Sequence, residues 1–223
     1  MKLPSLLNFL QEAAGEHANK LKFGVHDLNM SNDTWVLSRM RVEINRWPEI
    51  GENIMVETWP KGFDRLFAIR DFRVYDSKGE VLVRASSYWL VVDRDSKRPK
   101  MMTNISKELI NPEISAIDQK LEKITLAKNT DFYFSKKTVS SEIDVNGHVN
   151  NVYYSEWIFN TLPAEILKER KLICYEINYM AEVFVDEMVD IELGWDQTAE
   201  NLMLGSVKRG NKEVCRVKLL FET

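Results

Sequence analysis

The amino-acid sequence predicts an α+β protein made of two similar units, each a helix followed by an antiparallel sheet. Near the start, apolar side chains recur at the spacing of a helix, and the segments that follow alternate with a period of two. The same order of helix and strands returns in the second half of the chain. Residues 49–58, EIGENIMVET, also match residues 184–193, FVDEMVDIEL, in an acidic residue followed by apolar alternation. Two copies of one unit are the simplest account of this repetition.

The first unit, residues 1–115, begins with the helix. Pro4 suits a first helical turn, and the apolar spacing after it predicts a helix over 4–21. From Trp35 to Ile44 one strict alternation predicts a strand with Met40 on one face and Trp35, Leu37 and Arg39 on the other. Further strands are predicted at 53–59, 64–75 and 80–92, the last two joined by the turn sequence DSKG.

The second unit, residues 116–223, follows a segment of weak periodicity, 94–131, that predicts a linker with one or two short helices. A strand is predicted at 132–140 and a short, largely buried helix at 152–162. Four more strands are predicted at 175–184, 188–195, 202–209 and 213–221. The first unit lacks a counterpart of the strand that opens the second. Neither unit can cover both faces of a sheet, so we expect the two to share a core.

Composition excludes several classes of protein. A formal charge of −4 and a pI near 5.6, with scattered basic residues, argue against a nucleic-acid binder. The two cysteines, Cys174 and Cys215, lie in separate strand-like runs, which excludes a disulfide framework and a CxxC metal site. The first residues do not resemble a signal peptide, and no apolar run is long enough to cross a membrane. We expect a cytoplasmic protein without a metal or cofactor.

One polar stretch stands out, SSEIDVNGHVNN at 140–151, directly before the second predicted helix. Turn formation and helix capping alone could require its Asp, Gly and Asn residues. A calcium-binding loop is disfavoured, because Val149 and Ser155 occupy the positions that need a glycine and an acidic ligand. A catalytic role is the other explanation, and because the first unit has nothing like DVNGH, any chemistry of this turn occurs once in the chain. His17 and His26 lie outside any polar cluster and are expected to serve packing or a loop.

Four segments together resemble the fatty acyl-ACP thioesterases: TWVLSRMRVEI (34–44), the hairpin at 71–93, DVNGHVNN (144–151) and YMAEVF (179–184). The resemblance implies a double hotdog fold over nearly the whole chain. It also implies a catalytic set on the polar stretch and on the following strand: Asp144, Asn146, His148 and Glu182. Val183 stands where plant members have a cysteine, so we do not expect a cysteine nucleophile. The resemblance places the acyl chain in the first unit, near Trp35, Leu37, Arg39 and Met40.

The chemistry of these residues is compatible with thioester hydrolysis. Histidine exchanges a proton near neutral pH, which makes His148 the expected general base. Asn146 could donate to the carbonyl oxygen or orient water, and backbone N–H groups near Asn150 and Asn151 could hold the developing oxyanion. Asp144 could orient Asn146 or His148, or attack directly. Glu182 could activate the water or fix the imidazole.

The sequence therefore predicts an enzyme that hydrolyses acyl-acyl carrier protein (acyl-ACP) and so ends fatty-acid synthesis. An acyl-CoA thioesterase is the first alternative, and a non-catalytic acyl-binding hotdog protein or a hydratase is the second. The expected partners are acyl carrier protein and, in a homodimer, a second copy of the chain, with no nucleic acid and no membrane. An acidic carrier needs a local basic surface. The candidates are two clusters, Lys97, Arg98 and Lys100, and Lys168, Arg170 and Lys171.

Overall fold

The computed structural model describes residues 1–101, 110 and 113–222. The chain divides into two compact units, Met1–Leu121 and Glu122–Thr223. The boundary predicted from the sequence lies after residue 115. Part of the predicted linker, 102–109 and 111–112, lies outside the described residues. Within the described part, no helix combines the length and the apolar character needed to span a membrane.

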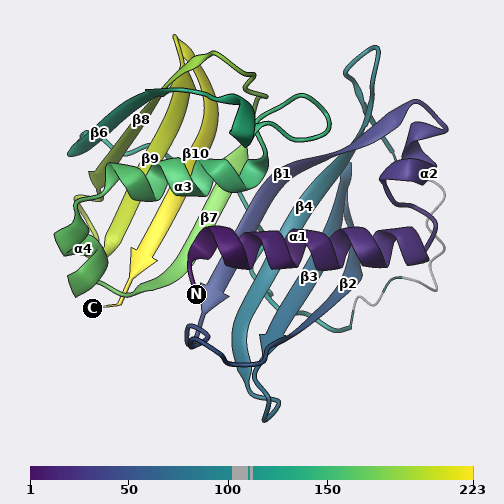
Figure 1. The fold of residues 1–223 in the computed structure, drawn as a ribbon, viewed down its shortest axis with the longest axis horizontal. Helices are drawn as coiled ribbons and strands as arrows, with labels where there is room; N and C mark the ends of the chain where they lie inside the picture. The colour runs from purple at the N-terminus through teal and green to yellow at the C-terminus, as the bar shows by residue number, and fades with distance from the viewer. Residues whose placement is uncertain (102–109, 111–112, 223) are drawn as a thin grey trace. The chain divides into compact units, whose positions relative to one another are not determined.

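Unit 1 is a helix lying across an antiparallel sheet (Figure 1). Its helix is α1 (Leu3–Lys20), as predicted. Its strands are β1 (Asp33–Ile44), β2 (Met55–Asp64), β3 (Phe67–Tyr75) and β4 (Val81–Asp93), in the order β2-β3-β4-β1. Two short elements were not predicted, helix α2 (Val25–Asn29) and strand β5 (Pro99–Lys100), which pairs with β4.

The apolar side of α1 and one face of the sheet form the core of unit 1. Pro4 lies in the first turn of α1, where its missing N–H has no partner to lose. The helix buries six residues at helical spacing: Leu3, Leu6, Leu7, Leu10, Ala14 and Ala18. On β3, Phe72 and Val74 are also buried, with exposed fractions of 1% and 0%. Burial of this apolar area is the main force that holds α1 on the sheet.

The predicted strict alternation in β1 is wrong at Ser38. The pairing of β1 with β4 shifts between Leu37, opposite Trp89, and Arg39, opposite Tyr88. This bulge inserts one extra residue and exchanges the faces on which the following side chains lie. Trp35 and Leu37 therefore share a face with Met40, whereas Arg39 lies on the other face.

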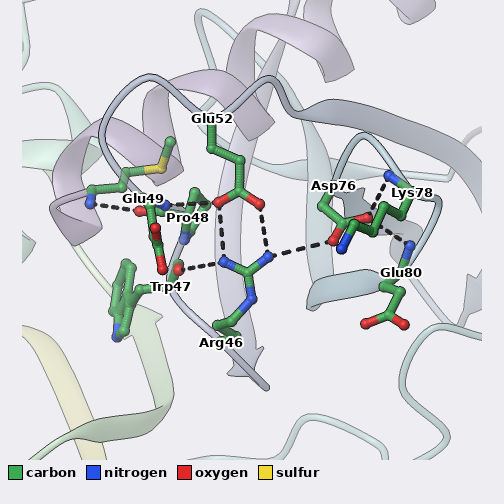
Figure 2. Close-up of polar contacts among 9 residues, drawn as sticks. Arg46, Trp47, Pro48, Glu49, Glu52, Asp76, Lys78 and Glu80 are labelled. Atoms are coloured by element: carbon green, nitrogen blue, oxygen red, sulfur yellow. Dashed lines mark hydrogen bonds and ion pairs between the residues drawn. The ribbon is translucent and has the colours of Figure 1, made fainter.

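A network of polar contacts fixes the loop that follows β1. Figure 2 shows the Arg46 guanidinium between two carboxylates, at 2.7 Å from Glu52 Oε1 and 3.4 Å from Asp76 Oδ2. Asp76 also accepts hydrogen bonds from the backbone N–H groups of Lys78 and Glu80 in the β3–β4 turn. The pKa of Glu52 is lowered to about 2, chiefly by the hydrogen bond that Arg46 donates to its carboxylate. The network thus connects two loops at the same end of the sheet. Its hydrogen bonds are exposed to solvent.

Unit 2 repeats the arrangement, with α3 (Asn151–Thr161) across the sheet (Figure 1). The strands are β6 (Phe132–Lys137), β7 (Leu172–Tyr179), β8 (Met188–Trp195), β9 (Leu202–Arg209) and β10 (Lys212–Phe221), in the order β7-β10-β9-β8-β6. The 3-10 turn η2 (Ser140–Glu142) precedes α3, and α4 (Ala164–Glu169) follows it. Of the predicted strands, 175–184 is wrong at its end, because β7 stops at Tyr179.

The helix of unit 2, α3, is largely buried, as predicted. Trp157 and Ile158 are 1% and 0% exposed, and Tyr154 packs against Trp157 with ring centroids 4.9 Å apart. The Tyr179 ring at the end of β7 meets the Tyr154 ring edge-on at 5.4 Å. This aromatic cluster holds the N-terminal part of α3, and with it the preceding polar turn, in a fixed place.

Candidate active site

The polar stretch forms a closed turn around Asp144. Asp144 N–H donates to His148 O at 2.8 Å, and Gly147 N–H donates to Asp144 O at 3.0 Å. The carboxylate Oδ1 of Asp144 accepts the N–H of Asn146 at 2.8 Å and that of His148 at 3.4 Å. Gly147 has φ +81°, a conformation that glycine adopts without strain. The side chain of Asp144 therefore shapes the turn that carries Asn146 and His148.

Two backbone contacts and one buried carboxylate attach this turn to the rest of unit 2. Val149 N–H donates to Val183 O at 2.8 Å, and Asn150 N–H donates to Glu142 O at 2.9 Å. Glu142 is 6% exposed, and its carboxylate accepts hydrogen bonds from Lys136, from Trp157 Nε1 at 2.8 Å and from Val139 N–H at 2.9 Å. Burial acts to raise the pKa of Glu142, but these bonds outweigh it and hold the pKa below its usual range.

Glu142, which anchors the turn through its buried carboxylate, is not among the residues predicted from the sequence. A single glutamate between two serines and an isoleucine looks like a residue of a solvated turn. Trp157 reaches it from α3 and Lys136 from β6, so the site of Glu142 forms only in the folded unit. Because its charge is both buried and paired, removal of one partner would leave an uncompensated charge or donor inside unit 2.

His148 meets Glu182 in the centre of the site. Nε2 of His148 lies 3.3 Å from Oε2 of Glu182, and the side chains are 26% and 44% exposed. The Phe184 ring packs edge-on against the imidazole with centroids 5.0 Å apart. These two contacts fix the plane of the ring while one side stays open to solvent. Glu182 lies in the loop after β7, so its predicted position on a strand is wrong.

Asn146 lies two residues before His148, at the surface of the turn. The residue is exposed, and its side chain makes no hydrogen bond to any described residue. Its neighbour Val145 is fully exposed at the tip of the turn. The amide of Asn146 is therefore available to a molecule that approaches from solvent.

The N-terminus of α3 faces the same turn. Asn150 is the N-cap, and its Oδ1 accepts the N–H of Val152 at 3.1 Å. Because the N–H of Asn150 is bonded to Glu142 O, the N–H of Asn151 is the first in the helix without a described acceptor. The helix dipole adds positive potential at this point. The backbone of Asn151 rather than that of Asn150 can therefore hold an oxyanion.

The residues predicted to bind the acyl chain lie in unit 1 and divide between two faces of its sheet. Trp35, Leu37 and Met40 share the face that packs on α1, with Leu37 and Met40 each 6% exposed. Arg39 lies on the opposite face, where it donates to Leu121 O and stacks over the Phe67 ring at 5.1 Å. Three of the four predicted residues thus lie on the face of the sheet that packs on α1.

The two thiols are buried inside unit 2. Cys174 and Cys215 are 4% and 0% exposed, and no disulfide joins them. Burial raises the pKa of the Cys215 thiol well above its ordinary value. Since the thiolate is the nucleophilic form, this environment opposes nucleophilic catalysis by Cys215. In the described parts of the chain, no group of three or more His, Cys, Asp or Glu residues is placed to hold a metal ion.

Half of the basic side chains predicted to contact a carrier have partners within the chain. Lys100 Nζ lies 2.6 Å from Asp33 and 2.8 Å from Asp93. Arg170 stacks on the Trp195 ring at 4.6 Å, and Lys171 pairs with Glu222 at 3.3 Å. The other three, Lys97, Arg98 and Lys168, are exposed and form no ion pair with a described residue.

Two family models match the chain. The acyl-ACP thioesterase N-terminal domain covers residues 1–112, and the acyl-ACP thioesterase C-terminal domain covers residues 127–223. Among curated proteins, the chain is similar to a chloroplastic palmitoyl-acyl carrier protein thioesterase of Arabidopsis thaliana. The two are 31% identical over 84% of this chain and 49% of the relative. Oleoyl-acyl carrier protein thioesterase 1 of the same plant is 28% identical over 83% and 56%. The chain spans about half the length of the curated relatives it matches.

Solved structures show the same fold. An acyl-ACP thioesterase from Bacteroides thetaiotaomicron matches all of this chain and 90% of its own, with a TM-score of 0.91 and 30% identity. The 12:0-ACP thioesterase from Umbellularia californica matches the same shares, with a TM-score of 0.85 and 26% identity. The architecture is therefore a double hotdog, as the sequence predicts.

Proposed function

The chain belongs to the acyl-ACP thioesterase family, and from this premise we propose that it hydrolyses fatty acyl-ACP to a free fatty acid and the carrier thiol. The observation that carries the proposal is the contact of His148 with Glu182, on a turn that leads into α3, whose first N–H has no described acceptor. A base, a group that orients it and an oxyanion donor are the parts that acyl transfer to water requires.

In the proposed reaction, His148 takes a proton from a water molecule whose oxygen attacks the thioester carbonyl carbon. Glu182 holds the imidazole through Nε2, so that Nδ1 is left to face the water. The ring of Phe184 limits rotation of the imidazole. The protonated His148 then returns its proton to the departing thiolate as the carbon–sulfur bond breaks. Thiolate is a good leaving group, so this last step makes the smallest demand on the site.

The N–H of Asn151 stabilises the oxyanion that forms when water adds to the carbonyl. It lies at the positive end of α3, and the cap by Asn150 keeps the first turn in place. The amide of Asn146 is the second donor. Asp144 contributes by closing the turn through two backbone N–H groups, which sets the distance between Asn146 and His148. Asp144 is thus a positioning residue in this scheme.

The acyl chain lies in unit 1, in the layer between α1 and the sheet. The support is that Trp35, Leu37 and Met40 all face this layer, which is otherwise lined by the leucines of α1. The carrier docks through a basic surface that includes Lys97, Arg98 or Lys168. We place the reaction in the cytoplasm and at the end of fatty-acid synthesis, although the names of the plant relatives place those proteins in chloroplasts.

The test is release of free thiol from a series of acyl-ACP substrates, with the same acyl groups on coenzyme A for comparison. The proposal predicts turnover of acyl-ACP with a higher kcat/KM than that of the matching acyl-CoA. Efficient turnover of acyl-CoA alone would assign the chain to the acyl-CoA alternative. Absence of turnover with every thioester would favour the alternative of a non-catalytic acyl-binding protein.

A further inference from the structure

A buried arginine without a carboxylate partner lies between α1 and the sheet of unit 1. Arg70 of β3 is 7% exposed. Its Nη1 lies 3.0 Å from His17 Nδ1 on α1 and donates to Thr58 Oγ1 on β2 at 3.2 Å. Among the described residues it has no ion pair, and its Nε and Nη2 have no hydrogen-bond acceptor. A largely buried charge without an opposite charge beside it is unfavourable.

The partners of Arg70 form a polar group inside an apolar layer. Arginine only donates, so Nδ1 of His17 accepts, and the imidazole is neutral with its proton on Nε2. Burial, followed by the charges of Arg70 and Lys20, lowers the pKa of His17. Burial also lowers the pKa of Arg70, to about 10, so the guanidinium still carries its charge at neutral pH. Ser87 Oγ donates to Arg70 O at 3.2 Å and brings a further hydroxyl into the group.

The polar group interrupts the face on which the acyl chain is placed under the proposed function. Toward the C-terminal end of β3, the next two residues on the same face are Phe72 and Val74, which are 1% and 0% exposed. In the other direction lie Trp35 and Trp89, whose rings meet edge-on at 6.3 Å. Met40 is close to Arg70 in the sheet, since both pair with Ser87.

We propose that Arg70, with His17 and Thr58, is the determinant of acyl chain length, a polar stop at which the hydrocarbon chain must end. A methyl or methylene group that reached Arg70 would displace its few polar contacts and gain no apolar surface in return. Shorter chains would bury every carbon against Leu37, Met40 and the leucines of α1. This inference rests on the proposed function and adds the residue that selects among acyl chains.

The test compares chain-length profiles of kcat/KM for acyl-ACP in the wild type, Arg70→Met, Arg70→Lys and Arg73→Met. Methionine is close to arginine in length but apolar, and its fold is checked by circular dichroism and thermal melting. Arg70→Lys keeps the positive charge. Arg73 is the matched control, because it lies on β3 with its side chain on the opposite face, where it donates to Ser115 O at 3.0 Å.

We expect Arg70→Met to raise kcat/KM about tenfold, relative to the optimal chain, for chains at least two carbons longer than the wild-type limit. This is the scale set by burial of two additional methylenes. Arg70→Lys and Arg73→Met should keep the wild-type profile. An unchanged profile in a folded Arg70→Met variant, or an equal shift in Arg73→Met, overturns the inference while the proposed function stands. A wild type that hydrolyses no acyl thioester overturns both.

Discussion

His148 Nε2 lies 3.3 Å from Glu182 Oε2, and the two residues reach this contact from different segments of unit 2. His148 comes from the turn before α3, and Glu182 comes from the loop after β7. The backbone bond from Val149 to Val183 joins these segments one residue away from each partner. The backbone therefore positions the two side chains close together, and the contact does not depend on their conformations alone.

This contact predicts the effect of removing the carboxylate. Glu182→Ala should lower kcat by about 10- to 10²-fold with little change in KM, because the imidazole loses the group that orients it. Glu156→Ala, a change of an exposed carboxylate on α3, serves as the control and should retain the wild-type rate. The measurement is steady-state thiol release. Equal rates for the wild type and a folded Glu182→Ala variant would remove Glu182 from the mechanism.

A second prediction separates the shape of the polar turn from the charge of Asp144. Asp144→Asn retains an oxygen that can accept the N–H groups of Asn146 and His148, whereas Asp144→Ala has none. We expect Asp144→Ala to lose much more kcat than Asp144→Asn. If both variants fold and lose kcat to the same extent, the negative charge takes part in the chemistry and Asp144 is more than a positioning residue.

The buried thiols provide a third prediction. Cys174→Ala and Cys215→Ala should both remain active, and a thiol reagent should label neither cysteine in the folded wild type. Labelling after denaturation is the positive control. Loss of activity in a folded Cys215→Ala variant would require a mechanism in which that thiol participates.

A fourth prediction concerns recognition of the carrier. Attraction between an acidic carrier and exposed basic side chains weakens with salt, since the Debye length falls from ~10 Å at 0.1 M to ~3 Å at 1 M. KM for acyl-ACP should therefore rise steeply with NaCl. Reversal of charge at Lys97 and Arg98 together, or at Lys168, should raise KM several-fold with little effect on kcat.

Lys78→Glu, a reversal in the exposed β3–β4 turn, is the control for a general effect of net charge. A KM that does not respond to salt would exclude electrostatic docking of the carrier. If KM rises with salt but neither reversal changes it, the basic surface lies elsewhere on the chain.

Periodicity was sufficient for most of the fold because each long element buries one regular face. The leucines of α1 and the alternation in β4 are visible in the sequence without any partner. The bulge at Ser38 is not, because an inserted residue leaves the composition of a strand unchanged and is seen only in its pairing. The face predicted for Arg39 was wrong for this reason.

The candidate site was likewise predictable from the sequence only in part. Short polar residues before a helix drew attention to Asp144, Asn146 and His148, and the resemblance supplied Glu182, which is far from them in the sequence. Glu142 and Arg70 gave no signal, since a charged residue looks exposed until tertiary packing surrounds it. His17 was expected to serve packing, and its contact with Arg70 depends on how α1 lies on the sheet.

The most direct test of the account is thiol release from acyl-ACP by His148→Ala, with His26→Ala as a matched change of an exposed histidine in unit 1. Loss of a general base should lower kcat on the order of 10²-fold or more, whereas His26→Ala should keep the wild-type rate. Circular dichroism and thermal melting establish that both variants fold. Wild-type kcat in a folded His148→Ala variant would contradict the assignment of His148 as the base.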